Sequence, residues 1–134
     1  RLKPYNLKLT HSKEVTKMAI SYAWDVKTVD TKTIDSNADT VFNVHWRLTA
    51  TDDTNTVSDG LGGTVNAAAT VYGTQSLDTS DLSSFTAFAD LTASDVQGWV
   101  EAAMTADKVT EMKTGLDATI AELVTPTSET KTIG

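Results

Sequence analysis

The stretch 85-FTAFADLTASDVQGWV-100 decides the fold, because it holds a complete signal for the start of a helix. Thr92 stands where an N-cap belongs, and Asp95, three residues later, can return the hydrogen bond in a capping box, with Asp in place of the usual Glu or Gln. Leu91 and Val96 flank this cap at the spacing of a hydrophobic staple. The sequence therefore predicts a helix that begins directly after Thr92.

This predicted helix has a single apolar face. Its apolar residues recur at i, i+3, i+4, i+7 and i+8: Val96, Trp99, Val100, Ala103 and Met104. Phe85 and Phe88, just upstream, are the nearest side chains that could cover this face. We expect Phe85, Phe88 and Trp99 to form a compact aromatic cluster of ordinary core, rather than a ligand-binding aromatic box, because aromatic side chains dominate core burial.

Strands are predicted before this helix. Residues 20–26 alternate apolar and polar side chains, residues 40–51 do so most clearly, and residues 64–72 form a third alternating run. Residues 31–34 either extend the first strand or pair separately. Residues 52–63, rich in Asp, Asn and Gly, are predicted to be a polar connecting loop. Residues 85–91 could add a short fourth strand.

A second helix is predicted after a break at residues 105–107. Its apolar residues are spaced three and four apart: Val109, Met112, Leu116, Ile120 and Leu123. This seam is too short for a coiled coil, so core packing is favoured, and Pro126 ends the helix. The predicted architecture is α+β: an antiparallel sheet of three to four strands, from Met18 to about Tyr72, with both helices on one face. That face carries Phe42, Val44, Trp46 and Leu48, together with Tyr22 and Trp24.

Composition limits the possible functions. The chain has 134 residues, enough for one domain with its own core, and a net charge of -7, which argues against a nucleic-acid partner. It has no cysteine, so disulfides and thiolate metal sites are excluded. No apolar run is long enough to predict a membrane span, and no segment resembles a secretion signal.

Residues 1–17 differ from the remainder in charge. They carry five basic residues and one acid, a balance of +4, which leaves -11 for residues 18–134. Codons for Lys13, Glu14 and Val15 (AAG GAG GTN) contain a bacterial ribosome-binding sequence a short distance before Met18. We therefore interpret residues 1–17 as a non-native upstream leader and residues 18–134 as the single domain with a polar C-terminal tail. The alternative is a genuine basic arm that docks on an acidic neighbour.

Few residues suggest chemistry. His45 falls on the polar face of its strand beside Asn43 and Arg47, and we expect a solvated surface residue, because a catalytic histidine needs an orienting partner that the sequence does not identify. Asp53 and Asn55 begin like an EF-hand, but the pattern fails at later positions. A looser Ca²⁺ site using Asp52, Asp53 and Asp59 remains an alternative.

Neither a phosphate-binding loop nor a nucleophile elbow is present. No catalytic residue, cofactor site or metal ligand is therefore assigned from the sequence. We expect a chain that is not an enzyme, binds no cofactor and is unsuited to a small-molecule ligand.

Several motifs together carry a family resemblance. They are Phe85-x-x-Phe88-x-Asp90-Leu91-Thr92, Val96-x-Gly98-Trp99-Val100, Met18-Ala19-Ile20-Ser21-Tyr22-x-Trp24 and Val44-x-Trp46-x-Leu48-x-x-x-Asp52. In this pattern the chain resembles small uncharacterised proteins of tailed bacteriophages, particularly marine and cyanobacterial ones. The motifs consist of packing and capping residues, and the family brings no active-site residues.

The resemblance implies a phage virion structural or assembly protein that acts through protein–protein contacts or self-association, located in the virion or the host cytoplasm. The alternative is a phage-encoded acidic binding module that masks a host protein. A third hypothesis, an enzyme, would require a concave pocket with perturbed titratable groups.

Overall fold

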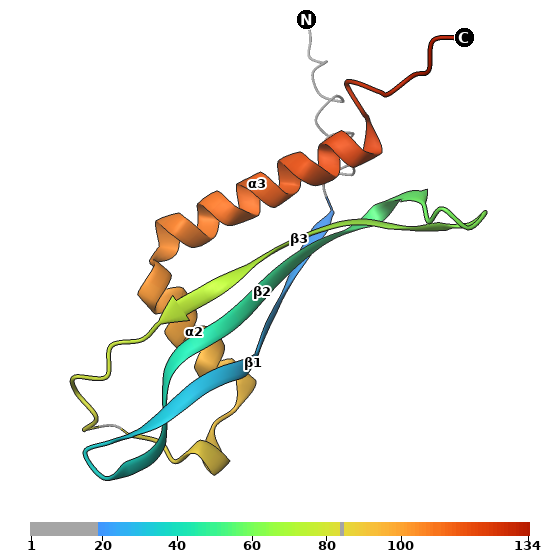
Figure 1. Cartoon of the computed structure of the whole chain (residues 1–134). Helices are drawn as coiled ribbons and strands as arrows, with labels where there is room; N and C mark the ends of the chain where they lie inside the picture. Colours follow the sequence, from blue (N-terminus) through green and yellow to red (C-terminus); the bar gives the residue numbers. More distant parts are fainter. Residues whose placement is uncertain (1–18, 84) are drawn as a thin grey trace, which may run out of the picture.

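A three-stranded antiparallel sheet with two helices on one face forms the structure (Figure 1). The computed structural model describes residues 19–83 and 85–134, so the proposed leader at residues 1–17 lies outside the described residues. The elements are β1 (Ile20–Ile34), β2 (Asn37–Ser58), β3 (Thr64–Ser76), the 3-10 turn η2 (Phe88–Asp90), α2 (Ala93–Met104) and α3 (Ala106–Val124). The predicted α+β architecture is confirmed.

β2 is the central strand, and both neighbours pair with it antiparallel in the order β1-β2-β3. It is longer than predicted, because residues 52–58 continue the strand where a loop was expected. Only the turn between Ser58 and Thr64 connects β2 to β3, and these two residues pair with each other. Asp52 is the last β2 residue that pairs with β1. Beyond it, β2 and β3 alone form a projecting arm. Because none of residues 53–58 is buried, this part of β2 needs no alternation of apolar and polar side chains, and its polar sequence did not predict a strand.

The core lies between the sheet and the helices. Val44, Trp46 and Leu48 are buried, as predicted, and Trp24 packs edge-to-face on Trp46 with ring centroids 5.8 Å apart. Phe42 departs from the prediction, since Val41 is buried in its place and Phe42 is only half-buried. A register shift explains this change: Asp30 pairs with Asn43 but Thr31 pairs with Val41, so Phe42 is the extra residue of a bulge.

α2 begins directly after Thr92 with the predicted capping box, in which Thr92 Oγ1 accepts from the Asp95 N–H and the Asp95 carboxylate accepts from the Thr92 N–H. The predicted aromatic cluster is wrong. Phe88 is 47% exposed and Trp99 is 38% exposed. α2 turns Val96 and Val100 to the core. With these two residues facing inward, Trp99 lies on the flank of the helix.

No fourth strand forms at residues 85–91, where Phe88 begins the 3-10 turn η2 instead. The two helices meet at the predicted break, where Thr105 has a φ of 80°. α3 buries Val109, Leu116 and Ile120, whereas Leu123, which was predicted to belong to the same seam, is 45% exposed. Within the described residues no helix has the length and apolar character needed to span a membrane.

Candidate functional site

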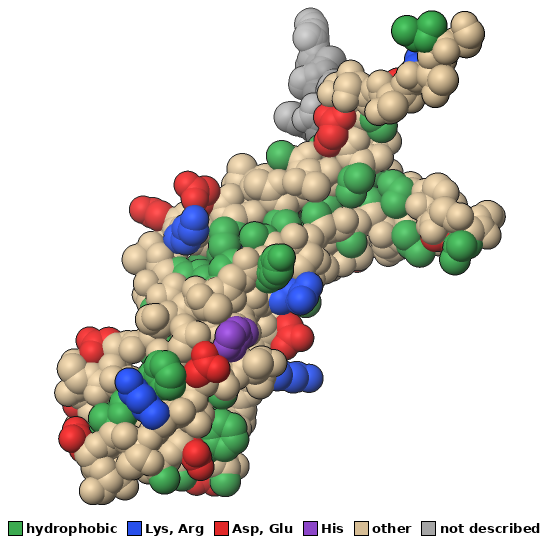
Figure 2. All heavy atoms as spheres, viewed as in Figure 1, with side chains coloured by type: hydrophobic (Ala, Val, Ile, Leu, Met, Phe, Trp, Pro, Cys, Tyr) green, Lys and Arg blue, Asp and Glu red, His purple; other side chains and the backbone are tan. Residues whose placement is uncertain are grey.

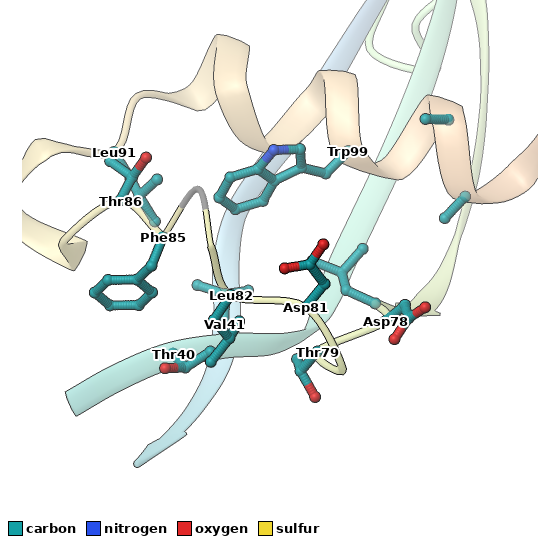
Figure 3. Close-up of a pocket in the computed structure, with 13 residues that line it drawn as sticks. Thr40, Val41, Asp78, Thr79, Asp81, Leu82, Phe85, Thr86, Leu91 and Trp99 are labelled. Atoms are coloured by element: carbon teal, nitrogen blue, oxygen red, sulfur yellow. The ribbon is translucent and has the colours of Figure 1, made fainter. Parts of the chain in front are cut away.

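A pocket of about 480 Å³ opens between α2, the beginning of β2 and the chain that leads from β3 to α2 (Figure 3). Most of its wall is apolar. The lining residues are Thr40, Val41, Leu77, Asp78, Thr79, Asp81, Leu82, Phe85, Thr86, Leu91, Trp99, Ala102 and Ala103. The pocket therefore uses the same stretch, residues 85–100, that begins the helix.

The helix contributes one large and two small side chains to the pocket. Trp99 reaches over it from α2, with Val41 on the β2 side (Figure 3). Ala102 and Ala103 line the same flank of the helix, and their small side chains leave the pocket open. An exposed indole beside an apolar hollow is characteristic of a contact surface rather than of a sealed core.

Two carboxylates in the segment that leads from β3 to α2 border the pocket. Asp78 Oδ1 accepts from the Ser80 N–H at 2.9 Å, and Asp81 Oδ1 accepts from the Ser83 N–H at 3.0 Å. The side-chain and backbone groups of Ser80 lower the pKa of Asp78, and the backbone and side-chain groups of Ser83 lower the pKa of Asp81. Both aspartates are therefore ionised at neutral pH, and they give an apolar pocket a negative border.

His45 lies on the opposite, solvent-facing side of the sheet and is exposed, as predicted. It nevertheless has the partner that the sequence did not identify: Asp30 Oδ2 lies 2.9 Å from His45 Nε2 and accepts from Asn43 Nδ2 at 2.9 Å. The hydrogen bonds from Asn43 and then His45 lower the pKa of Asp30. Asp30 comes from the far part of β1, which pairs past a bulge, so periodicity could not align the two residues.

The pair of His45 and Asp30 is open to solvent. The side chains of His45 and Asp30 are 45% and 44% exposed, so water screens their interaction. Arg47 lies over the ring of Tyr72 nearby, at 5.4 Å from the centroid. His45, Arg47 and Tyr72 line a second pocket of about 460 Å³ on this side of the sheet, and Figure 2 shows the histidine at the surface.

The three aspartates of the alternative Ca²⁺ site point to different places. Asp52 is 2% exposed, and its carboxylate accepts from the N–H groups of Thr54 and Asn55 and from Asn55 Nδ2. Asp53 is exposed, and Asp59 lies at the tip of the arm, where it accepts from the N–H groups of Leu61 and Gly63. Across residues 19–83 and 85–134, no group of three or more His, Asp and Glu side chains is arranged to hold a metal.

Comparison with known proteins gives a family but no named relative. No curated protein matches the chain, and no solved structure does. Residues 19–133 match a family described as Domain of unknown function (DUF7936). This match covers β1 to α3, including every residue that lines the pocket. The chain belongs to the DUF7936 family.

Proposed function

We propose that the chain is a structural or assembly protein of a tailed bacteriophage and that it acts through protein–protein contacts. The observation that carries the proposal is the exposed Trp99 beside an apolar pocket bordered by two ionised aspartates. Tryptophan is enriched among the residues that dominate protein interfaces. The phage assignment is supported by the motifs of residues 18–24, 44–52 and 85–100.

The pocket suits one large apolar side chain of a protein partner, next to a lysine or arginine. Its volume of about 480 Å³ is ample for a leucine, phenylalanine or tryptophan side chain. Asp78 and Asp81 would attract the neighbouring cation, and the net charge of -7 favours a basic partner surface at longer range. We infer an apolar anchor that supplies affinity and a basic neighbour that supplies orientation.

A second candidate is an acidic binding module that masks a host protein in the host cytoplasm. The negative net charge supports it, because an acidic surface can occupy a basic site and would do so with strong salt dependence. The two candidates differ in location. A structural protein is retained in finished particles, whereas a masking module acts inside the infected cell and is left behind.

Mass spectrometry of purified particles of the encoding virus tests the proposal. Peptides from residues 18–134 at a constant ratio to a coat or tail protein are the expected result. Their complete absence from particles, together with their presence in infected cells, would contradict the structural role and favour the masking module.

A pair of matched variants tests the pocket itself. Ala102→Trp fills the pocket, while Ala118→Trp adds the same side chain to an exposed position on α3 that does not line it. In virus carrying each variant, we expect particles to lose the Ala102→Trp protein and to retain the Ala118→Trp protein. Equal retention of both would show that the pocket is not the contact.

A further inference from the structure

The two edges of the sheet differ in how they are protected. β1 carries four charged residues, Asp25, Lys27, Asp30 and Lys32, and three register irregularities. Charges and bulges are the usual devices that stop an edge strand from pairing with another chain. β3 carries no charged residue in its 13 positions, and its pairing with β2 is unbroken from Ala68 to Ser76. The β3 edge lacks the protection that the β1 edge has.

The direction of the β3 backbone groups follows from its pairing. Leu77 N–H donates to the Phe42 carbonyl, and hydrogen-bonded pairs alternate along an antiparallel ladder. The N–H and C=O groups of Thr70, Tyr72 and Thr74 therefore point away from β2. Between Ala68 and Thr74, the described residues give no backbone hydrogen bond on this outer side. Ser76, the next residue of the same phase, has its carbonyl capped by Gln75 Nε2 at 2.9 Å.

The side chains along this edge also suit pairing. Thr70 and Thr74 are exposed, and Tyr72 is 68% exposed. β-branched and aromatic residues make the favourable cross-strand pairs of antiparallel sheets. This edge is an incomplete sheet that a further strand of the same kind would extend.

We propose that β3 pairs with β3 of a second copy of this chain, in antiparallel orientation about a twofold axis, to form a continuous six-stranded sheet. The occupant follows from self-complementarity: in antiparallel pairing, the outward N–H and C=O groups of one β3 edge face the same groups of an identical edge, and no like charges meet there because β3 has none. The pairing is isologous and uses the unprotected edge of both copies, so it closes at a dimer. This inference deepens the proposed function. The pairing of β3 is independent of that function, and only the presence of the dimer in a phage particle rests on it.

Sedimentation of the full chain over a range of concentrations tests the inference with a matched pair of variants. Thr70 and Ala23 lie in one row across the sheet, since both pair with Thr49, and both are exposed. Thr70→Lys places a cation on the β3 edge, and Ala23→Lys places the same cation on the β1 edge. We expect a wild-type dimer, a dissociation constant raised at least about tenfold by Thr70→Lys and one changed less than about twofold by Ala23→Lys.

Cysteine cross-linking keeps the test valid if Thr70→Lys misfolds. The chain has no cysteine, so Thr70→Cys or Thr74→Cys should form a disulfide-linked dimer under mild oxidation, while Ala23→Cys should not. A chain that stays monomeric up to about 100 μM, or a dimer that Ala23→Lys weakens and Thr70→Lys does not, would overturn the inference. So would a monomer whose β3 edge binds a different phage protein.

The two proposals fail in different ways. A monomer that is found in particles would overturn β3 pairing and leave the structural role standing. A dimer that depends on β3 but is absent from particles would overturn the structural role and leave the pairing intact.

Discussion

Asp52 is a buried carboxylate whose removal should destabilise the fold measurably. It is 2% exposed and pairs with Ile20, the first residue of β1, at the point where β2 continues into the arm. Its two oxygens accept three hydrogen bonds, from the N–H groups of Thr54 at 2.8 Å and Asn55 at 3.0 Å and from Asn55 Nδ2 at 2.9 Å. A hydrogen bond to a charged group contributes roughly 1.5–3 kcal/mol, and the three bonds share one acceptor group. We therefore expect Asp52→Ala to lower the free energy of unfolding by about 3–5 kcal/mol.

Two further variants make this prediction specific. Asp52→Asn keeps an oxygen for the two backbone donors but presents an NH₂ group to Asn55 Nδ2, so it should cost about 1–2 kcal/mol. Asp53→Ala removes an adjacent, exposed carboxylate whose bond to Ser21 Oγ is 3.4 Å long, so it should cost less than about 0.5 kcal/mol. Urea unfolding followed by tryptophan fluorescence measures all three. A loss below about 1 kcal/mol for Asp52→Ala, or equal losses for both alanine variants, would refute the reasoning.

The pH dependence of the same site has a definite sign. Burial raises the pKa of Asp52, but the bonds from the Asn55 side chain and the two N–H groups outweigh it and hold the pKa below its ordinary value of 3.8. A group with a lowered folded-state pKa contributes stability above its unfolded-state pKa and loses it as pH falls through the folded value. The wild-type chain should therefore lose stability more steeply below about pH 4 than Asp52→Asn does. Parallel pH profiles for the two proteins would contradict this.

Three other predictions concern packing, capping and the contact between sheet and helix. Gly73→Ala should cost about 1–3 kcal/mol, because its Cβ would lie 2.9 Å from Cζ2 of the buried Trp46; an unchanged urea midpoint would show that the indole yields freely. Thr92→Ala should cost about 1 kcal/mol by removing the N-cap of α2, whereas Ser94→Ala should leave stability unchanged within about 0.5 kcal/mol. Tyr22 donates to Asp117 Oδ1 at 2.6 Å, and burial followed by this carboxylate raises the pKa of Tyr22 to about 12. Since tyrosine ordinarily titrates at 10.0, the stability from this group is present below pH 10 and lost as pH rises toward 12. Tyr22→Phe should abolish that alkaline loss, and an unaltered profile would count against the bond.

The parts of the fold that depend on local signals could be predicted from the sequence. The capping box at Thr92, the break at Thr105 and the alternation through Val44, Trp46 and Leu48 all appear in the structure. Each reflects chemistry between residues close in the chain, or a period imposed by one buried face. Helix and strand types follow from such signals without any long-range contact.

The features that could not be predicted depend on the register between strands and on strand pairing outside the core. The bulge that turns Val41 inward and Phe42 aside arises from how β1 meets β2, and the polar arm after Asp52 has no buried face to mark it as strand. The pocket has the same origin, because Trp99 fits a helical core pattern and only the rotation of α2 leaves it exposed. Asp30, the partner of His45, is likewise placed by a register shift.

Zero-length carbodiimide cross-linking of purified particles, read by mass spectrometry, tests the proposed contact most directly. It joins carboxylates to lysines in contact, and Asp78 and Asp81 are the carboxylates that border the pocket. The account predicts cross-links from one or both of these aspartates to a lysine of another virion protein, lost when Ala102→Trp fills the pocket. Cross-links that form only at acids elsewhere on the chain, with none at this loop, would contradict it.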